Sequence, residues 1–270
     1  MRDVWTEPLA ASVTESDFAG RIRLSALLGV MQNAADRHLE DTGVSVGRML
    51  EHGMAWILMT TRLDLLAVPK LGDVLTLETW NCGASGVLWV RDYRLLNGTG
   101  EEIARASTAW TLVDLAKRRI LRPSAYPFPL EVSSRPSLAG APGKVKLPGS
   151  EEASWSEDVP YTVPYSAVDC YGHLNNARYA DLCADLLTPD ELRERDIRSI
   201  HIAYSREAAL GDRLSLRRAE RGDEVFVSGR SAGGQRTFDA ILGLAARSMP
   251  EQSPSPGSEL SKQDERSEER

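Results

Sequence analysis

Apolar residues recur along this chain with two periods, and each period predicts one kind of element. Between residues 24 and 39, and again between 179 and 187, they return every three or four positions, as in helices with one buried face. Segments with alternating or β-branched residues follow each helix and predict strands. The predicted strands are residues 56–66, 74–80, 87–96 and 102–115, then 199–207, 213–219, 224–230 and 237–246.

The two halves of this pattern match each other. Asp17-x-x-Gly20 precedes the first helix and Asp169-x-x-Gly172 the second, and a Gly-Asp pair enters the second strand of each run. Each half therefore predicts a leading strand, a long helix and about four antiparallel strands. In such an α+β unit, helix and sheet bury each other's apolar faces.

The composition of the segments predicts the domain limits. Residues 1–130 form the first unit and residues 161–248 the second. Residues 131–160 are rich in Pro, Gly and Ser, which predicts a linker. Residues 249–270 contain almost nothing apolar, so we expect a disordered tail.

Charge and composition exclude several classes of protein. The 270 residues include 39 acidic and 32 basic ones, a net charge of −7, which argues against a nucleic-acid partner. We find no membrane span, because no apolar run approaches about 18 residues, and the charges near the start argue against a secretory signal. Three cysteines without a pairing pattern indicate reduced thiols and no structural zinc, so we expect a cytoplasmic protein.

Polar side chains gather where the second half passes from strand to helix. Asp169, Tyr171, His173, Asn175 and Asn176 lie within eight positions. Unpaired amides at a helix N-terminus can hold a carbonyl oxygen that becomes an oxyanion, which makes this cluster a candidate catalytic site. The alternative is structural, with an asparagine capping the helix and a histidine that only packs.

The first half lacks this chemistry, because Arg21 stands where the second half has His173. One half is thus predicted to carry the chemistry and the other to provide shape. A further candidate is Glu207, which strand alternation places on the same face as His201. A glutamate near a strand end is more often simply solvated.

A serine-hydrolase signature, Gly-x-Ser-x-Gly, occurs once at residues 229–233. That motif needs a catalytic histidine downstream, whereas all four histidines precede Ser231. We therefore interpret the segment as a hairpin turn. Phosphate-binding glycine loops and closely spaced metal ligands are also missing from the sequence.

The sequence of residues 169–179 resembles the Asp-x-Asn-x-His-Val-Asn-Asn-x-x-Tyr signature of the acyl-acyl-carrier-protein thioesterases, which are tandem hot-dog proteins. The resemblance extends over about residues 5–246. In the first half it rests on Trp56, Pro69-x-x-Gly72-Asp73, Thr79-Trp80, Arg91-Asp92-Tyr93, Ala106-x-x-x-Trp110 and Arg118-Arg119. It implies a tandem (double) hot-dog fold with two antiparallel sheets, each wrapped around a long helix.

The resemblance implies hydrolysis of the thioester between a fatty acyl chain and acyl carrier protein, without metal or cofactor, by a monomer or homodimer. Asp169, His173 and Glu207 match family catalytic positions. Two positions depart from the family: Tyr171 replaces a catalytic asparagine, and Ala208 replaces a cysteine.

From these positions we expect Glu207 to take a proton from the attacking water and His173 to position that water or polarise the carbonyl. Asp169 would orient His173 or the turn, and the amides that follow Asn175 would hold the oxyanion. The hydroxyl of Tyr171, on a longer stem, would take the place of the missing asparagine.

The resemblance places the acyl-chain pocket in the first half. Candidate lining residues are Met31, Met54, Trp56 and Met59, although residues at such spacing are more often plain core. A basic patch for an acidic carrier protein is a further candidate, although such a cluster is more often simply a solvated face. Its residues are Arg193, Arg195, Arg198, Arg217 and Arg218.

Three alternative functions stay open. The first is a thioesterase that acts on acyl-coenzyme A. The second is a catalytically weak acyl-thioester-binding protein, which the replacement at Tyr171 suggests. The third alternative is a serine hydrolase that uses Ser231.

Overall fold

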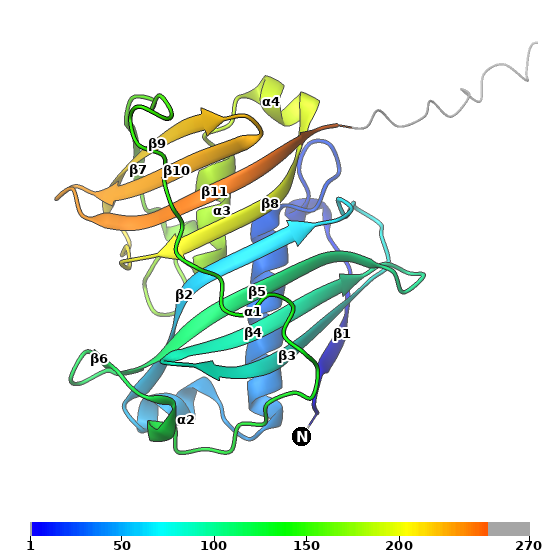
Figure 1. Ribbon diagram of the computed structural model, residues 1–270, viewed down its shortest axis with the longest axis vertical. Coiled ribbons are helices and arrows are strands. Elements are labelled where there is room, and N and C mark those ends of the chain that lie inside the picture. The colour runs from blue at the N-terminus through cyan, green and yellow to red at the C-terminus, as the bar shows by residue number, and fades with distance from the viewer. Residues whose placement is uncertain (1, 248–270) are drawn as a thin grey trace, which may run out of the picture.

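A computed structural model describes residues 2–247, and the predicted tail at 249–270 lies outside the described residues (Figure 1). The first half contains β1 (Trp5–Leu9), α1 (Leu24–Asp41), α2 (Val46–Glu51), β2 (Met54–Leu65), β3 (Leu75–Ser85), β4 (Leu88–Leu96), β5 (Glu102–Asp114) and β6 (Arg119–Ile120). The second half contains β7 (Val159–Thr162), α3 (Tyr179–Ala184), α4 (Pro189–Glu194), β8 (Arg195–Tyr204), β9 (Arg213–Arg221), β10 (Glu224–Ser231) and β11 (Arg236–Ala246). None of the helices between residues 2 and 247 has the length and apolar character needed to cross a membrane.

Within residues 2–247, the strands of both halves form one continuous sheet. Its order is β1-β3-β4-β5-β2-β8-β11-β10-β9-β7, and β6 adds to β5. The two halves meet through antiparallel pairing of β2 with β8, from Thr60 opposite Ala203 to Asp64 opposite Ser199. Figure 1 shows α1 and α3 on the same side of this sheet. The predicted order of strand, helix and antiparallel meander is confirmed in both halves.

The second helix is shorter than the apolar periodicity indicates. A 3-10 turn at Asn176–Arg178 leads into α3, which ends at Ala184. Four residues later a capping box starts α4, in which the side chain of Thr188 accepts from the amide of Glu191 and Pro189 occupies the first turn. A separate short helix thus follows α3 where the apolar periodicity predicted one longer helix.

The main hydrophobic core runs through both halves. In α1 the buried residues recur every three or four positions and include Leu24, Leu28, Met31 and Ala35. These side chains share one core cluster with residues of α3 and of the sheet from both halves. Because this core does not stop at the junction between β2 and β8, helix burial and sheet pairing stabilise the same arrangement.

The segment between the halves crosses the face of the sheet opposite α1 (Figure 1). Residues 126–158 form no helix and only one isolated bridge. Asp92, which is fully buried, accepts hydrogen bonds from the Ser137 hydroxyl (2.8 Å) and the Leu138 amide (2.6 Å) of this segment. Charge-assisted bonds of this kind are stronger than neutral ones and fix the path of the segment.

The Gly-x-Ser-x-Gly sequence forms a hairpin turn, as predicted. The Ser231 amide donates to the carbonyl of Gln235 (2.8 Å), which closes the turn between β10 and β11. Gly229 lies against the ring of Phe238, which is fully buried. A β-carbon at Gly229 would meet that ring at 2.2 Å.

We therefore expect Gly229→Ala to lower the free energy of unfolding by about 1 to 3 kcal/mol, because the buried ring of Phe238 has to move. The matched control is Gly233→Ala, where the nearest atom would lie 3.9 Å away. Urea denaturation of both variants measures the difference. Equal stability of the two variants would contradict the prediction and show that the ring of Phe238 moves aside at little cost.

Candidate active site

The polar cluster of the second half forms a tight turn before α3. The amide of Asp169 donates to the carbonyl of His173 (2.9 Å), and its carboxylate accepts from the amide of Tyr171 (2.9 Å). Gly172 adopts a φ of 78°, which glycine adopts without strain. The sequence thus fixes a loop from which the side chains of Tyr171 and His173 project.

A second loop, which follows β8, brings Glu207 to this turn. The Leu174 amide donates to the carbonyl of Ala208 (2.7 Å), and the Leu210 amide donates to that of Gly172 (3.2 Å). As a result, Nε2 of His173 lies 3.6 Å from Oε2 of Glu207. The side chains are 39% and 63% exposed, so both are open to water and to a ligand.

The expectation that Glu207 shares a strand face with His201 is wrong. β8 ends at Tyr204, three residues before Glu207, so the alternation of a strand does not reach it. His201 instead contacts the segment between the halves, with Nε2 2.9 Å from the carbonyl of Gly143.

Asn175 caps the turn that follows. Its side-chain oxygen accepts from the amide of Ala177 (3.0 Å), which is the structural role that the sequence left open. The hydroxyl of Tyr204 donates to the carbonyl of Asn176 (3.0 Å) and fixes the turn from the side of the sheet. The amide of Ala177 is thereby occupied, whereas the amide of Asn176 takes part in none of these bonds.

Burial and nearby negative charge raise the pKa values of two tyrosines at the site. Burial raises the pKa of Tyr179, and the carboxylates of Glu207 and Asp169 raise it further. Burial also raises the pKa of Tyr171, together with negative charge on Cys170, Asp36 and Asp169. The hydroxyl of Tyr171, whose residue is 53% exposed, therefore stays protonated at neutral pH and can donate a hydrogen bond.

The first half repeats the turn with different side chains. The amide of Asp17 donates to the carbonyl of Arg21 (2.8 Å), as Asp169 does to His173. The Ile22 amide donates to Pro69 (2.9 Å), as Leu174 does to Ala208. By this correspondence Val68 lies where the second half has Glu207.

Arg21 connects the two halves. It is 7% exposed, and its guanidinium binds the carboxylates of Asp17 (2.6 Å) and Asp196 (2.9 Å). It also donates to the carbonyl of Leu192 (2.9 Å). In the first half, the position equivalent to His173 therefore carries an arginine that cross-links the two halves.

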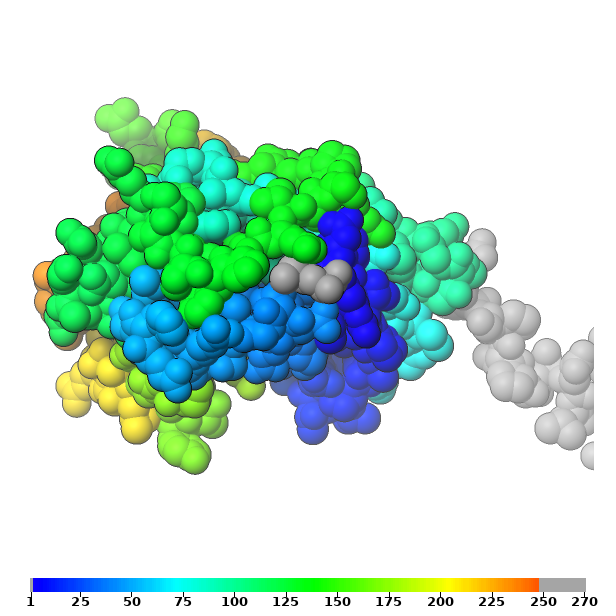
Figure 2. Space-filling view, turned by 90° about the horizontal axis from the view of Figure 1, so that it is seen from below, coloured from blue at the N-terminus to red at the C-terminus, as the bar shows by residue number. Residues whose placement is uncertain are grey.

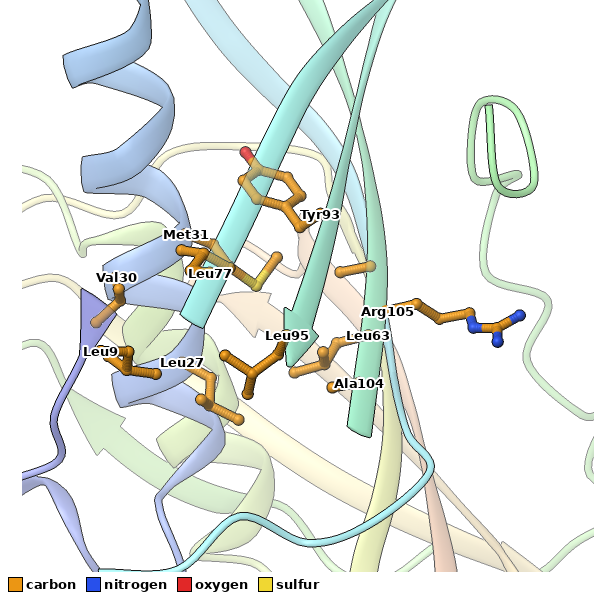
Figure 3. Close-up of a pocket in the computed structure, with 11 residues that line it drawn as sticks. Leu9, Leu27, Val30, Met31, Leu63, Leu77, Tyr93, Leu95, Ala104 and Arg105 are labelled. Atoms are coloured by element: carbon orange, nitrogen blue, oxygen red, sulfur yellow. The ribbon is translucent and has the colours of Figure 1, made fainter. Parts of the chain in front are cut away.

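Two cavities lie between α1 and the sheet of the first half. The apolar cavity has a volume of about 10 Å³, roughly the room of one water molecule. Figure 3 shows Met31, Leu27 and Leu95 around it, while Arg105 points away. The aromatic cavity is larger, about 70 Å³, and is lined by Ala35, Asp36, Leu39, Trp56, Asn81, Trp89, Val90, Arg91, Trp110 and Leu130.

The four residues expected to line an acyl pocket have different places. Met31 lines the apolar cavity and Trp56 the aromatic cavity. Met54 packs at the end of the first half with a small cluster that includes Met49. Met59 is the extra residue of a bulge in β2. Met54 and Met59 line neither cavity.

α2 and the segment after β6 close the end of the first half at which Met54 and Trp56 lie. Figure 2 shows them side by side, and the guanidinium of Arg48 lies 4.7 Å from the ring centre of Phe128. Tyr126 packs against Trp56 and Trp89 at ring-centre distances of 5.4 and 5.9 Å. The aromatic cavity is therefore covered by aromatic side chains at this end.

Asp36 and Arg91 line the aromatic cavity but were not identified from the sequence. Alternation in β4 was the available signal, since it places Trp89, Arg91 and Tyr93 on one face. Burial raises the pKa of Asp36 to about 6, well above its usual range, although Arg91 opposes the shift. An ionisable carboxyl therefore lies in the region where an apolar pocket was expected.

The predicted basic patch is largely neutralised. Arg193 pairs with Asp190, Arg195 with Asp223, and Arg218 with Glu191. Arg198 donates to the carbonyl of Leu65, and the guanidinium of Arg217 lies over Trp155. Between residues 2 and 247, no group of three or more His, Cys, Asp or Glu side chains converges in a way that could hold a metal ion.

The paired halves, each with its helix on the shared sheet, define a double hot-dog protein, with a histidine–glutamate pair in one half. Two family models match the chain: the acyl-ACP thioesterase N-terminal domain at residues 2–124 and the C-terminal domain at residues 150–234. The chain belongs to the acyl-ACP thioesterase family.

Known proteins resemble this chain in sequence and in fold. A chloroplastic palmitoyl-acyl carrier protein thioesterase of Cuphea hookeriana is 24% identical over 68% of this chain and 47% of its own length. The chain thus spans about half the length of that relative. An acyl-ACP thioesterase from Bacteroides thetaiotaomicron has the same fold, with a TM-score of 0.82 at 22% identity over 90% of this chain and 98% of the other. For a 12:0-ACP thioesterase from Umbellularia californica the TM-score is 0.75 at 20% identity, over 92% and 99%.

The raised pKa of Asp36 makes a prediction about stability. Because the folded state holds this proton more tightly than the unfolded state, the free energy of unfolding falls as pH rises from about 4 to about 6. We expect Asp36→Asn to be more stable than the wild type at pH 8, by about 1 to 3 kcal/mol, and the gain to shrink towards pH 4.

Urea denaturation at pH 4, 6 and 8 measures this gain. Asp41→Asn, at an exposed position of the same helix, is the control and should change stability little at any pH. A gain that grew as pH fell would contradict the assignment.

Proposed function

We propose that this protein hydrolyses the thioester of a fatty acyl chain carried by acyl carrier protein. The observation that carries the proposal is the approach of Glu207 to His173, 3.6 Å apart and open to solvent on the half that keeps the polar turn. Membership of the acyl-ACP thioesterase family supports the class of substrate. A cytoplasmic location stays a prediction, since the plant relatives are named as chloroplastic.

In this proposal Glu207 acts as general base. It takes a proton from a water molecule whose oxygen attacks the thioester carbon, while His173 orients that water or the carbonyl. The tetrahedral intermediate then collapses with cleavage of the carbon–sulfur bond. The thiolate of the carrier leaves and takes up a proton, and the fatty acid is released.

The remaining residues of the turn support these two. Asp169 holds the turn through its bond to the amide of Tyr171, and this fixes the direction of His173. The amide of Asn176 is the available donor for the oxyanion, since Asn175 caps the amide of Ala177. Tyr171 supplies a neutral hydroxyl beside the water.

The position of Tyr171 also favours a second candidate function. A tyrosine where the family signature has a catalytic asparagine changes both the length and the geometry of the donor. The protein would then bind acyl thioesters without hydrolysing them. Acyl-coenzyme A is the alternative substrate.

Thiol release from a series of acyl carrier protein substrates tests the proposal. We expect Glu207→Gln to lower the rate by at least about 10²-fold, the low end of general-base effects. Glu224→Gln, an exposed glutamate on β10, is the matched control and should keep the wild-type rate.

Other outcomes separate the alternatives. Equal rates for wild type and Glu207→Gln would exclude Glu207 as base. Binding without thiol release would favour the binding protein, and faster release from acyl-coenzyme A would favour the other substrate. Loss of activity in Ser231→Ala would favour the alternative that the protein is a serine hydrolase.

A further inference from the structure

The sheet surface beneath α1 changes from apolar to polar and then to aromatic. Register places Leu63, Ala106 and Tyr93 side by side in one row next to the apolar cavity. Two residues further along the strands, the next row is polar and consists of Thr61, Thr108, Arg91 and Asn81. The row after that holds Trp89 opposite Trp110. The polar row therefore separates the apolar cavity from the aromatic cavity.

Tyr93 marks this boundary. Figure 3 shows its ring beside Leu77 and Leu95, with the hydroxyl directed away from the leucines. The ring lines the apolar cavity, and burial raises the pKa of its hydroxyl to about 12. An apolar chain that entered the aromatic cavity would have to cross the polar row to reach the apolar one.

Arg91 is a half-buried cation held by neutral partners. Its Nη1 lies 3.1 Å from Nδ1 of His38 and 3.3 Å from the hydroxyl of Thr79. Nε2 of His38 lies 2.8 Å from the carbonyl of Arg2, so the imidazole donates there and its Nδ1 accepts from Arg91. Burial lowers the pKa of His38, which keeps the imidazole neutral.

The charge of Arg91 has no carboxylate partner in the part of the chain that the structure describes. Asp36 lines the same cavity, yet no oxygen of it lies within 4.0 Å of the guanidinium. Among residues 2–247, the carboxylate of Asp36 accepts no hydrogen bond. A half-buried cation and a half-buried carboxyl thus line one cavity without contact, and a polar group between them would pair both.

The walls of the aromatic cavity add a further unpaired donor. Nε1 of Trp89 is buried and has no partner, whereas Nε1 of Trp110 donates to the hydroxyl of Thr108 (2.9 Å). A plain hydrocarbon chain would bury these polar groups and pair none of them. A ligand with an oxygen at this depth offers a partner to Arg91 and Asp36, which both line the cavity.

We propose that the acyl chain selected by this site carries a hydroxyl group, which occupies the aromatic cavity and joins Arg91 to Asp36. A hydroxyl donates one hydrogen bond and accepts two, so it can donate to the carboxylate of Asp36 and accept from Arg91. A keto oxygen only accepts and would leave Asp36 unpaired. This inference rests on the proposed function, and it names the chemical class of the acyl chain.

The test compares carrier-linked acyl chains of equal length that are unsubstituted, 3-oxo, 3-hydroxy or hydroxylated further along. For one hydroxyl position we expect kcat/KM to exceed that of the unsubstituted chain at least about tenfold, because sites built to bind a hydroxyl reject the analogue that lacks it. Asp36→Leu should lower kcat/KM for the hydroxylated chain at least about tenfold and raise it for the unsubstituted chain.

Asp41→Leu is the matched control, because it removes a carboxylate from an exposed position of α1. A preference of the wild type for the unsubstituted chain over every hydroxylated one would overturn the inference. An unchanged preference in Asp36→Leu would overturn it as well. Circular dichroism of Asp36→Leu confirms folding before the comparison.

The hydroxyl site and the proposed hydrolase function can be tested separately. If no substrate releases thiol, the hydrolase proposal is wrong, and calorimetric binding of the free hydroxylated and unsubstituted fatty acids still tests the cavity. Tighter binding of the hydroxylated acid, lost in Asp36→Leu, would support the hydroxyl site. Equal binding of both acids would exclude it.

Discussion

Antiparallel pairing of β2 with β8 is the interaction on which the rest of the structure depends. Five residue pairs along this ladder join the sheets of the two halves into one sheet. The pairing also satisfies backbone N–H and C=O groups that would otherwise lie unpaired at two sheet edges. The same ladder puts α1 and α3 on one side, where their buried faces share a core. The cavities beneath α1 and the polar turn before α3 belong to different halves and are held in a fixed relation by this pairing.

The two halves differ most clearly in the side chains of two equivalent turns. The same backbone bonds close both turns, so the backbone alone does not distinguish them. Arg21 uses its turn to bind Asp196 of the other half, whereas His173 uses the equivalent turn to face Glu207. One copy thus contributes to stability and the other is free to keep exposed, ionisable side chains, which add little to stability.

Local pattern in the sequence was sufficient to predict the elements and the repeat. Helix periodicity predicted α1, and alternation predicted most strands. Features that depend on register were not predictable, because register is a property of two strands. The end of β8 at Tyr204 therefore invalidated the face assigned to Glu207, and the row that joins Arg91 to Thr108 emerged only from pairing.

The strand order has a consequence for association with other chains. The path of the sheet ends at β1 and β7, which have five and four residues, and each contains a proline, Pro8 and Pro160. A proline cannot donate to a further strand, and short outer strands offer little length for pairing. The terminal strands are thereby poor templates for amyloid-like growth, even though the sheet between them is long and rich in apolar residues.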